Sequence, residues 1–189
     1  MESHELRSKA LKALDETTFY PSKGKERIKS MIETRPDWCV SRQRVWGVPL
    51  PIFISKKDGK VLIDDDVFEN IAQIYEKEGS DCWFSDDYQK LLGNKYKAED
   101  FNKLSDIVEV WFDSGSTHSF VLEKRADLKW PASMYLEGSD QHRGWFHSSL
   151  LESCGTRGKA PFESILSHGF VVDGKGLKMS KSQGNVIAP

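Results

Sequence analysis

Cysteine is scarce and scattered in this sequence. Its three cysteines, Cys39, Cys82 and Cys154, lie far apart, and none belongs to a Cys-x-x-Cys pair. A disulfide framework needs an even, closely spaced set of cysteines, and a thiolate zinc site needs paired ones. The pattern therefore argues against both, and we expect a reducing compartment, with the cytoplasm as the default.

Long apolar runs and a dominant charge are also missing. No run is long enough to span a bilayer and no signal-peptide pattern opens the chain, so we expect no membrane association. The formal net charge is -2, which gives no global basic field for binding nucleic acid and leaves only a local basic patch. The length of 189 residues, with 30% charged residues, suits a globular chain of one domain or one domain plus a small insertion.

The first 36 residues predict a helix, a strand and a second helix. Apolar spacing predicts helices over 5–14 and 25–34, the second of which ends before Pro36, and residues 17–20 are strand-like.

Tryptophan and arginine alternate in the next segment, residues 38–51. Arg42 and Arg44 could meet phosphates, with the faces of Trp38 and Trp46 available for stacking. Stacks of tryptophan on arginine and buried ion pairs would use the same residues without a ligand. The residue types alone leave both interpretations open.

Residues 54–106 look like a small α+β insertion in a larger fold. Asp58-Gly59 between the apolar runs 52–54 and 61–63 predicts a hairpin. The acidic run 64–66 could bind a metal, but capping of a helix that ends at Gly79 is the favoured interpretation.

Three β-rich runs then lead into polar loops. They cover residues 107–112, 134–136 and 165–172, and a helix that ends at Gly155 separates the last two. This order predicts half of a doubly wound parallel sheet, in which ligands bind at the carboxyl ends of the strands. His142 and His147 are interpreted as a helix-start and a helix-surface histidine, with no obvious third metal ligand.

The loop after the second strand and the loop that follows the third carry the chemistry. Residues 137–141 offer carboxylates, an amide and a glycine, which suit an ammonium group and ribose hydroxyls. Residues 174–185, the lysine loop, hold Lys178 and Lys181 between glycines, a pattern suited to phosphate oxygens. A solvated basic turn is the alternative for an arbitrary cluster of this kind.

Four motifs in order resemble the class I aminoacyl-tRNA synthetases, and in particular their bacterial isoleucyl branch. The matching stretches are Lys178-Met179-Ser180-Lys181-Ser182, residues 38–51, residues 111–118 and residues 135–146. The resemblance covers essentially the whole chain. It implies a segment leading into the catalytic core (1–53), the small insertion (54–106), and the second half of a Rossmann-type catalytic domain that ends in the lysine loop (107–189).

The resemblance also implies site residues. Glu137, Gly138, Asp140 and Gln141 fall on adenylate-binding positions, and Trp111 and Trp145 on the walls of the isoleucine side-chain pocket. Lys181, supported by Lys178, would contact ATP phosphates, and His168 would approach the nucleotide.

The implied reaction joins isoleucine to ATP, with Mg²⁺, and moves the acyl group to tRNA(Ile). The carboxylate of isoleucine is itself the nucleophile, so positioning and charge stabilisation carry the catalysis. No zinc is expected, because the hairpin at 54–60 lacks the cysteines that some relatives carry there.

Several parts of such an enzyme are absent. The His-Ile-Gly-His signature, the editing insertion and the anticodon-binding helices are not found, so we expect a fragment that is inactive alone. Two alternatives stay open: a fragment of the valyl enzyme, and a non-catalytic module that binds tRNA or protein.

Overall fold

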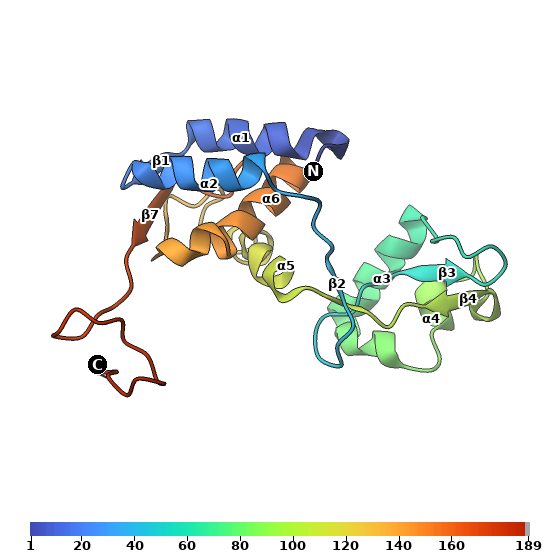
Figure 1. The fold of residues 1–189 in the computed structure, drawn as a ribbon. Helices are drawn as coiled ribbons and strands as arrows, with labels where there is room; N and C mark the ends of the chain where they lie inside the picture. The colour runs from blue at the N-terminus through green and yellow to red at the C-terminus, as the bar shows by residue number, and fades with distance from the viewer. Residues whose placement is uncertain (188–189) are drawn as a thin grey trace. The chain divides into compact units, whose positions relative to one another are not determined.

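A computed structural model describes residues 1–187 of the chain (Figure 1). The chain forms two compact units. Residues 1–38 together with those from 114 onward form the first, called the sheet unit here, and residues 39–113 form the second, the central unit. The predicted insertion, 54–106, falls inside the central unit.

A parallel three-stranded sheet organises the sheet unit. Strand β7 (Ser164–His168) lies between β1 (Thr18–Tyr20) and β6 (Tyr135–Gly138), and both pairings are parallel. The predicted α/β class with a parallel sheet is therefore confirmed. One of the predicted strands, 107–112, does not belong to this sheet, and β1 takes a place in it instead.

Three helices pack together beside the sheet. They are α1 (Leu6–Glu16), α2 (Lys23–Glu33) and α6 (Trp145–Arg157) (Figure 1). Their fully buried apolar residues form one core with the strands: Ala10, Leu14, Ile28, Ile32, Phe146, Leu150 and Ile165. Burial of large aliphatic and aromatic side chains of this kind contributes roughly 1.5–3 kcal/mol each. The unit thus has a core of its own.

Helix α6 ends later than predicted. Gly155 lies inside the helix, where an added Cβ would meet Leu6 Cδ1 of α1 at 3.7 Å. The helix ends instead at Gly158, which has a φ of 70° and donates its N–H to the carbonyl of Cys154. A left-handed residue at this point favours glycine, which explains the stop.

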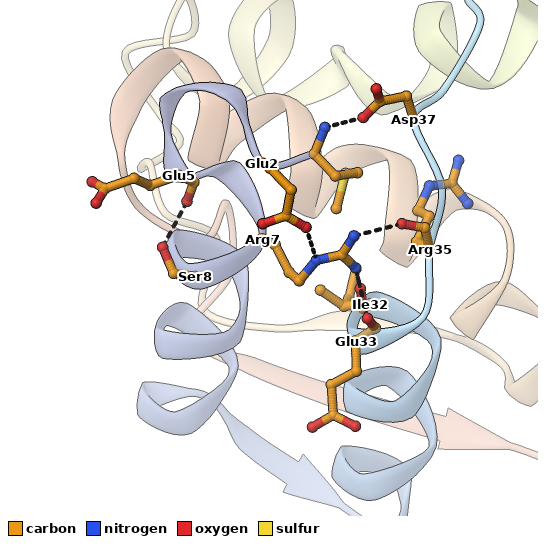
Figure 2. Close-up of polar contacts among 9 residues, drawn as sticks. Glu2, Glu5, Arg7, Ser8, Ile32, Glu33, Arg35 and Asp37 are labelled. Carbon is orange, nitrogen blue, oxygen red and sulfur yellow. Dashed lines mark hydrogen bonds and ion pairs between the residues drawn. The ribbon is translucent and has the colours of Figure 1, made fainter.

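Arg7 joins α1 to the end of α2 (Figure 2). Its guanidinium donates to the carbonyls of Glu33 and Arg35, at 2.8 Å each, and to that of Ile32. The last carbonyls of a helix have no partner within the helix, so Arg7 satisfies groups that would otherwise lack one.

The central unit has two short antiparallel pairs of strands. Strand β2 (Ser41–Arg42) pairs with β5 (Ile107–Val108), and β3 (Phe53–Ser55) pairs with β4 (Phe101–Lys103). The helices α3 (Asp65–Glu78) and α4 (Gln89–Leu92) and the 3-10 turns 80–84 and 98–100 complete it. Its buried core includes the aromatic residues Phe53, Trp83 and Phe101.

Two predicted features of this unit are confirmed. Asp64 caps α3 by accepting from Asp66 N at 3.1 Å, and the helix ends at Gly79, as predicted. The predicted hairpin also forms. Ile54 bridges to Val61, and the N–H groups of Leu62 and Ser55 donate to the carbonyls of Phe53 and Lys60 at 2.9 Å each, while β4 pairs with the other edge of β3.

The predicted strand over 107–112 is wrong beyond Val108. Helix α5 (Val110–Gly115) begins there, and the Glu109 carboxylate accepts the N–H of Trp111 at 3.0 Å. A carboxylate that satisfies a first-turn N–H favours helix over strand, despite the β-rich apolar residues. A π-helical turn, 118–122, follows.

The predicted surface position of His147 is also wrong. His147 is 3% exposed inside α6, and His142, in the 3-10 turn Ser139–His142, is 1% exposed. Burial lowers the pKa of both rings and brings that of His147 to about 4, with Arg35 a smaller cause.

Acid should therefore destabilise the sheet unit through His147. The folded state holds the ring neutral, whereas an unfolded histidine binds a proton below about pH 6.5, so stability falls by about 1.4 kcal/mol per pH unit from there to about pH 4. His147→Leu should remove this contribution. In urea titrations between pH 7 and pH 5, the unfolding free energy of the variant should change with pH as if one proton fewer were taken up on unfolding. An unchanged slope would contradict this assignment.

Candidate functional site

The polar loops after β6 and β7 begin side by side. The two strands are parallel, and their last residues, Gly138 and His168, are partners in register. A Cβ added to Gly138 would lie 3.9 Å from His168 Cε1. Both loops therefore leave from the carboxyl edge of the sheet, where open α/β folds bind ligands.

The Asp140 side chain lies close to Gly138 and would have to shift if a Cβ were added there. A Cβ at this position would lie 2.6 Å from Asp140 Oδ1, closer than real contacts permit. The Asp140 side chain thus folds back over the backbone of Gly138.

Gln141 ties this edge to α6. Its Nε2 donates to Asp140 Oδ2 at 3.1 Å, and its Oε1 accepts the N–H of Trp145 at 2.9 Å. The side chain thereby caps the first turn of α6 and orients the Asp140 carboxylate. Glu137 is exposed, and its carboxylate makes a long contact, 3.4 Å, with the N–H of Gly138.

Trp145 is held on two sides. Its ring stacks on Tyr135 with centroids 4.1 Å apart, and its indole N–H donates to the carbonyl of Ser114 at 2.9 Å. Trp111, 44% exposed, belongs to the central unit. A pocket shared by the two tryptophans stays a prediction.

The lysine loop follows β7. Val172 bridges to Lys178, and the Lys178 ammonium lies 3.7 Å from the centre of the Phe170 ring. Lys181 is exposed on the next turn. Both lysines lie in the same unit as Asp140, and their convergence on one ligand stays a prediction.

Two residues that organise this loop escaped the sequence analysis. Asp173 and Asn185 are joined by a hydrogen bond across the loop, from Asn185 Nδ2 to Asp173 Oδ2 at 2.9 Å. Twelve positions separate them, so no local pattern points to the pair; their only signal is that they flank the lysines.

In residues 38–51, some of the tryptophans and arginines have a structural use and others remain available to a ligand. Arg42 donates to the carbonyls of Cys39 and Ser41, at 2.7 Å each, and so has a structural use. Trp38 meets the guanidinium of Arg35 at 5.4 Å. Trp46, in contrast, is 92% exposed and lines a cavity of about 580 Å³ within the central unit.

The charges that line this cavity are mixed. Arg42 and Arg44 face it together with Asp81, Glu109 and Asp113. Opposite charges in similar number do not favour an anionic ligand such as a phosphate.

Residues 1–187 contain no group of three histidines, cysteines or carboxylates placed to hold a metal ion. None of their helices has both the length and the apolar character of a membrane-spanning segment.

Replacing Gly138 by alanine should displace the Asp140 carboxylate. The new Cβ would clash with Asp140 Oδ1, so we expect amide chemical shifts of residues 140, 141 and 145 to change in ¹H–¹⁵N spectra. Gly169→Ala is the matched control, because nothing lies within 4 Å of its added Cβ. Equal effects of both substitutions would refute the close packing of Asp140 on Gly138.

The family described as "tRNA synthetases class I (I, L, M and V)" matches residues 1–189. The isoleucine--tRNA ligase of Pelagibacter ubique is 82% identical over all 189 residues, which cover 100% of this chain and 21% of that protein. The enzyme of the same name from Brucella suis is 58% identical over 184 residues, covering 97% of this chain and 19% of the relative. The chain thus spans about a fifth of the length of these curated relatives.

Solved structures agree in fold. A leucyl synthetase from Agrobacterium radiobacter, in a complex described as LeuRS-tRNA-LeuAMS, has a TM-score of 0.52 at 19% identity, covering 82% of this chain and 22% of that one. A Mycobacterium tuberculosis methionyl-tRNA synthetase bound by methionyl-adenylate has a TM-score of 0.50 at 19% identity, covering 97% and 28%. Over its whole length, this chain therefore belongs to the family of class I tRNA synthetases for isoleucine, leucine, methionine and valine.

Proposed function

We propose that this chain is a segment of an isoleucine--tRNA ligase that acts in the cytoplasm on isoleucine, ATP and tRNA(Ile). The observation that carries the proposal is the 82% identity, across all 189 residues, to the Pelagibacter ubique ligase. The ordered strand edge around Gly138, Asp140 and Gln141 supports it, because this edge offers the polar groups that an adenylate needs.

The reaction needs no side-chain nucleophile. A carboxylate oxygen of isoleucine attacks the α-phosphorus of ATP, a new O–P bond forms, and the bond to pyrophosphate breaks. The 3′-terminal ribose of the tRNA then attacks the acyl carbon, its hydroxyl proton is lost, and AMP leaves. Orientation of the reactants and stabilisation of charge on the phosphates supply the acceleration.

The residues take the following roles in this proposal. Asp140 and Gln141 hold the ribose and the amino-acid polar atoms, Glu137 contacts the adenylate, and Gly138 allows close approach. Lys181, supported by Lys178, meets the phosphates, and His168 approaches the nucleotide from the neighbouring strand end. Trp145 and Trp111 would flank the isoleucine side chain. Mg²⁺ enters with ATP as part of the substrate.

The segment should function only within a longer protein. We expect the purified chain of 189 residues to show no isoleucine-dependent exchange of pyrophosphate into ATP, because the chain spans about a fifth of its relatives. Exchange at a rate near that of a complete ligase would contradict this expectation.

A chimeric enzyme tests the function directly. We would replace the matching segment of the Pelagibacter ubique ligase by this chain and measure pyrophosphate exchange with isoleucine and with valine. Faster activation of isoleucine is expected. Faster activation of valine would favour the valyl alternative, and a folded chimera that activates neither amino acid would favour the non-catalytic module.

Removal of the Asp140 carboxylate should weaken the binding of a non-hydrolysable isoleucyl-adenylate analogue to the chimera in calorimetric titrations. Loss of one charged hydrogen-bonding group in a polar site weakens binding by about tenfold or more. Asp127→Ala is the matched control, since Asp127 is an exposed aspartate of the same unit that pairs with Arg125. Undiminished binding by Asp140→Ala would remove Asp140 from the site.

A further inference from the structure

The lysine loop is held by polar contacts and not by a core. Its apolar residues are largely exposed: Leu177 by 57% and the preceding Val172 by 48%. Gly174, Gly176 and Gly184 add conformational freedom, which raises the entropy that must be lost when the loop is ordered. The conformation of the lysine loop must therefore depend on specific hydrogen bonds.

Asp173 accepts three of the hydrogen bonds that hold the loop. Its Oδ1 accepts the N–H groups of Lys175 and Leu177 at 2.9 Å each, and its Oδ2 accepts from Asn185 Nδ2 at 2.9 Å. All three partners are donors, so the position requires a group that only accepts. In keeping with this, the hydrogen bonds from Asn185, Leu177 and Lys175 lower the pKa of the Asp173 carboxyl.

Asn185 closes the other half. Its Oδ1 accepts the N–H of Ser180 at 3.0 Å, while its Nδ2 donates to the carbonyl of Lys178 at 3.2 Å as well as to Asp173. The carboxamide thus holds the backbone on both sides of Met179. A carboxylate here could not make the two donations.

These bonds determine where the two lysines lie. Lys178 has its carbonyl on Asn185 and its ammonium 3.7 Å from the centre of the Phe170 ring, so it is fixed at both ends. Lys181 sits on the turn that begins at Ser180, where Gly184 N donates to the carbonyls of Ser180 and Lys181. Ser180, the first residue of that turn, is the one anchored by Asn185.

We propose that Asp173 and Asn185 form a clasp that positions Lys178 and Lys181 for the phosphates of ATP. The inference rests on the proposed function and adds two positioning residues to it. A preorganised loop loses less conformational entropy when ATP binds, so the clasp acts on the affinity for ATP and not on that for isoleucine.

The clasp can be tested by exchanging its chemistry in the chimeric ligase. Asn185→Asp places two carboxylates side by side, and their charges repel. Asp173→Asn places two amide N–H₂ groups side by side, because the oxygen of the new carboxamide stays with Lys175 and Leu177, so neither nitrogen finds an acceptor in the other. Each should raise the KM for ATP by about tenfold, the effect of losing one charge-assisted hydrogen bond, with the KM for isoleucine changed by less than about twofold.

The double exchange, Asp173→Asn with Asn185→Asp, is the decisive variant. The new carboxamide at position 173 could still accept from Lys175 and Leu177 through its oxygen, and its nitrogen would donate to the new carboxylate at position 185. That carboxylate would still accept from Ser180, but it cannot donate to the Lys178 carbonyl, so the 3.2 Å bond becomes a contact between two acceptors. The KM for ATP should therefore fall below that of either single variant without returning fully to that of the unaltered chimera, because the bond between positions 173 and 185 is restored and the bond to Lys178 is not.

Gln183→Glu is the matched control. It makes the same change from amide to carboxylate in the same loop, at an exposed side chain outside the clasp. If Gln183→Glu raises the KM for ATP as much as Asn185→Asp does, added charge and not the clasp is the cause. The clasp is also refuted if the single variants leave this KM unchanged, or if the double variant is no better than the singles.

Amide hydrogen exchange in the chain of 189 residues separates the clasp from the proposed function. Asn185→Asp should speed exchange at Leu177 and Ser180, because repulsion between the new carboxylate and that of Asp173 moves both acceptors away from these N–H groups. Gln183→Glu should not speed it. An inactive unaltered chimera would sink the proposed function, and this measurement alone would then decide for or against the clasp: unchanged exchange refutes it.

Discussion

The parallel pairing of β6 with β7 is the constraint on which the site depends. It sets Gly138 beside His168 and sends the two polar loops away from the same edge of the sheet. Helix α6 then sets the position of the Asp140 carboxylate at this edge, since Gln141 both caps the helix and orients Asp140. A shift of one residue in this register would turn every side chain of the strand to the opposite face and separate the two loops.

The two sides of the candidate site are built by different physics. The strand edge is part of the sheet unit, which has an apolar core. Its polar groups are held in place because β6 and α6 pack into that core. The lysine loop has exposed apolar residues and depends on hydrogen bonds among Asp173, Asn185 and the backbone.

Much of the fold could be predicted because its signals are local. The cap of α3 at Asp64 and its stop at Gly79 are examples, as are the strand-forming runs at 17–20, 134–136 and 165–172, although the place of 17–20 in the parallel sheet was not predicted. The failures have two kinds of cause. Glu109 turns an apolar β-rich run into helix α5 through a local bond, since it accepts the N–H of Trp111, whereas packing of α1 against α6 carries α6 past Gly155. Burial of His147 and the contact between Asp173 and Asn185 likewise depend on tertiary structure that spacing does not reveal. The site residues named from the sequence remain predictions, although Gly138, Asp140, Gln141 and His168 do lie at one edge.

We propose that the adenylate binds at the carboxyl edge of β6 and β7, with the lysine loop, and not in the cavity of the central unit. Hydrogen–deuterium exchange of the chimeric ligase, with and without a non-hydrolysable isoleucyl-adenylate analogue, compares the two places in one experiment. We predict protection concentrated in residues 137–145 and 168–185. Protection confined to the residues around the cavity, 42–48 and 107–113, with none at the strand edge, would show that the adenylate does not bind at this edge.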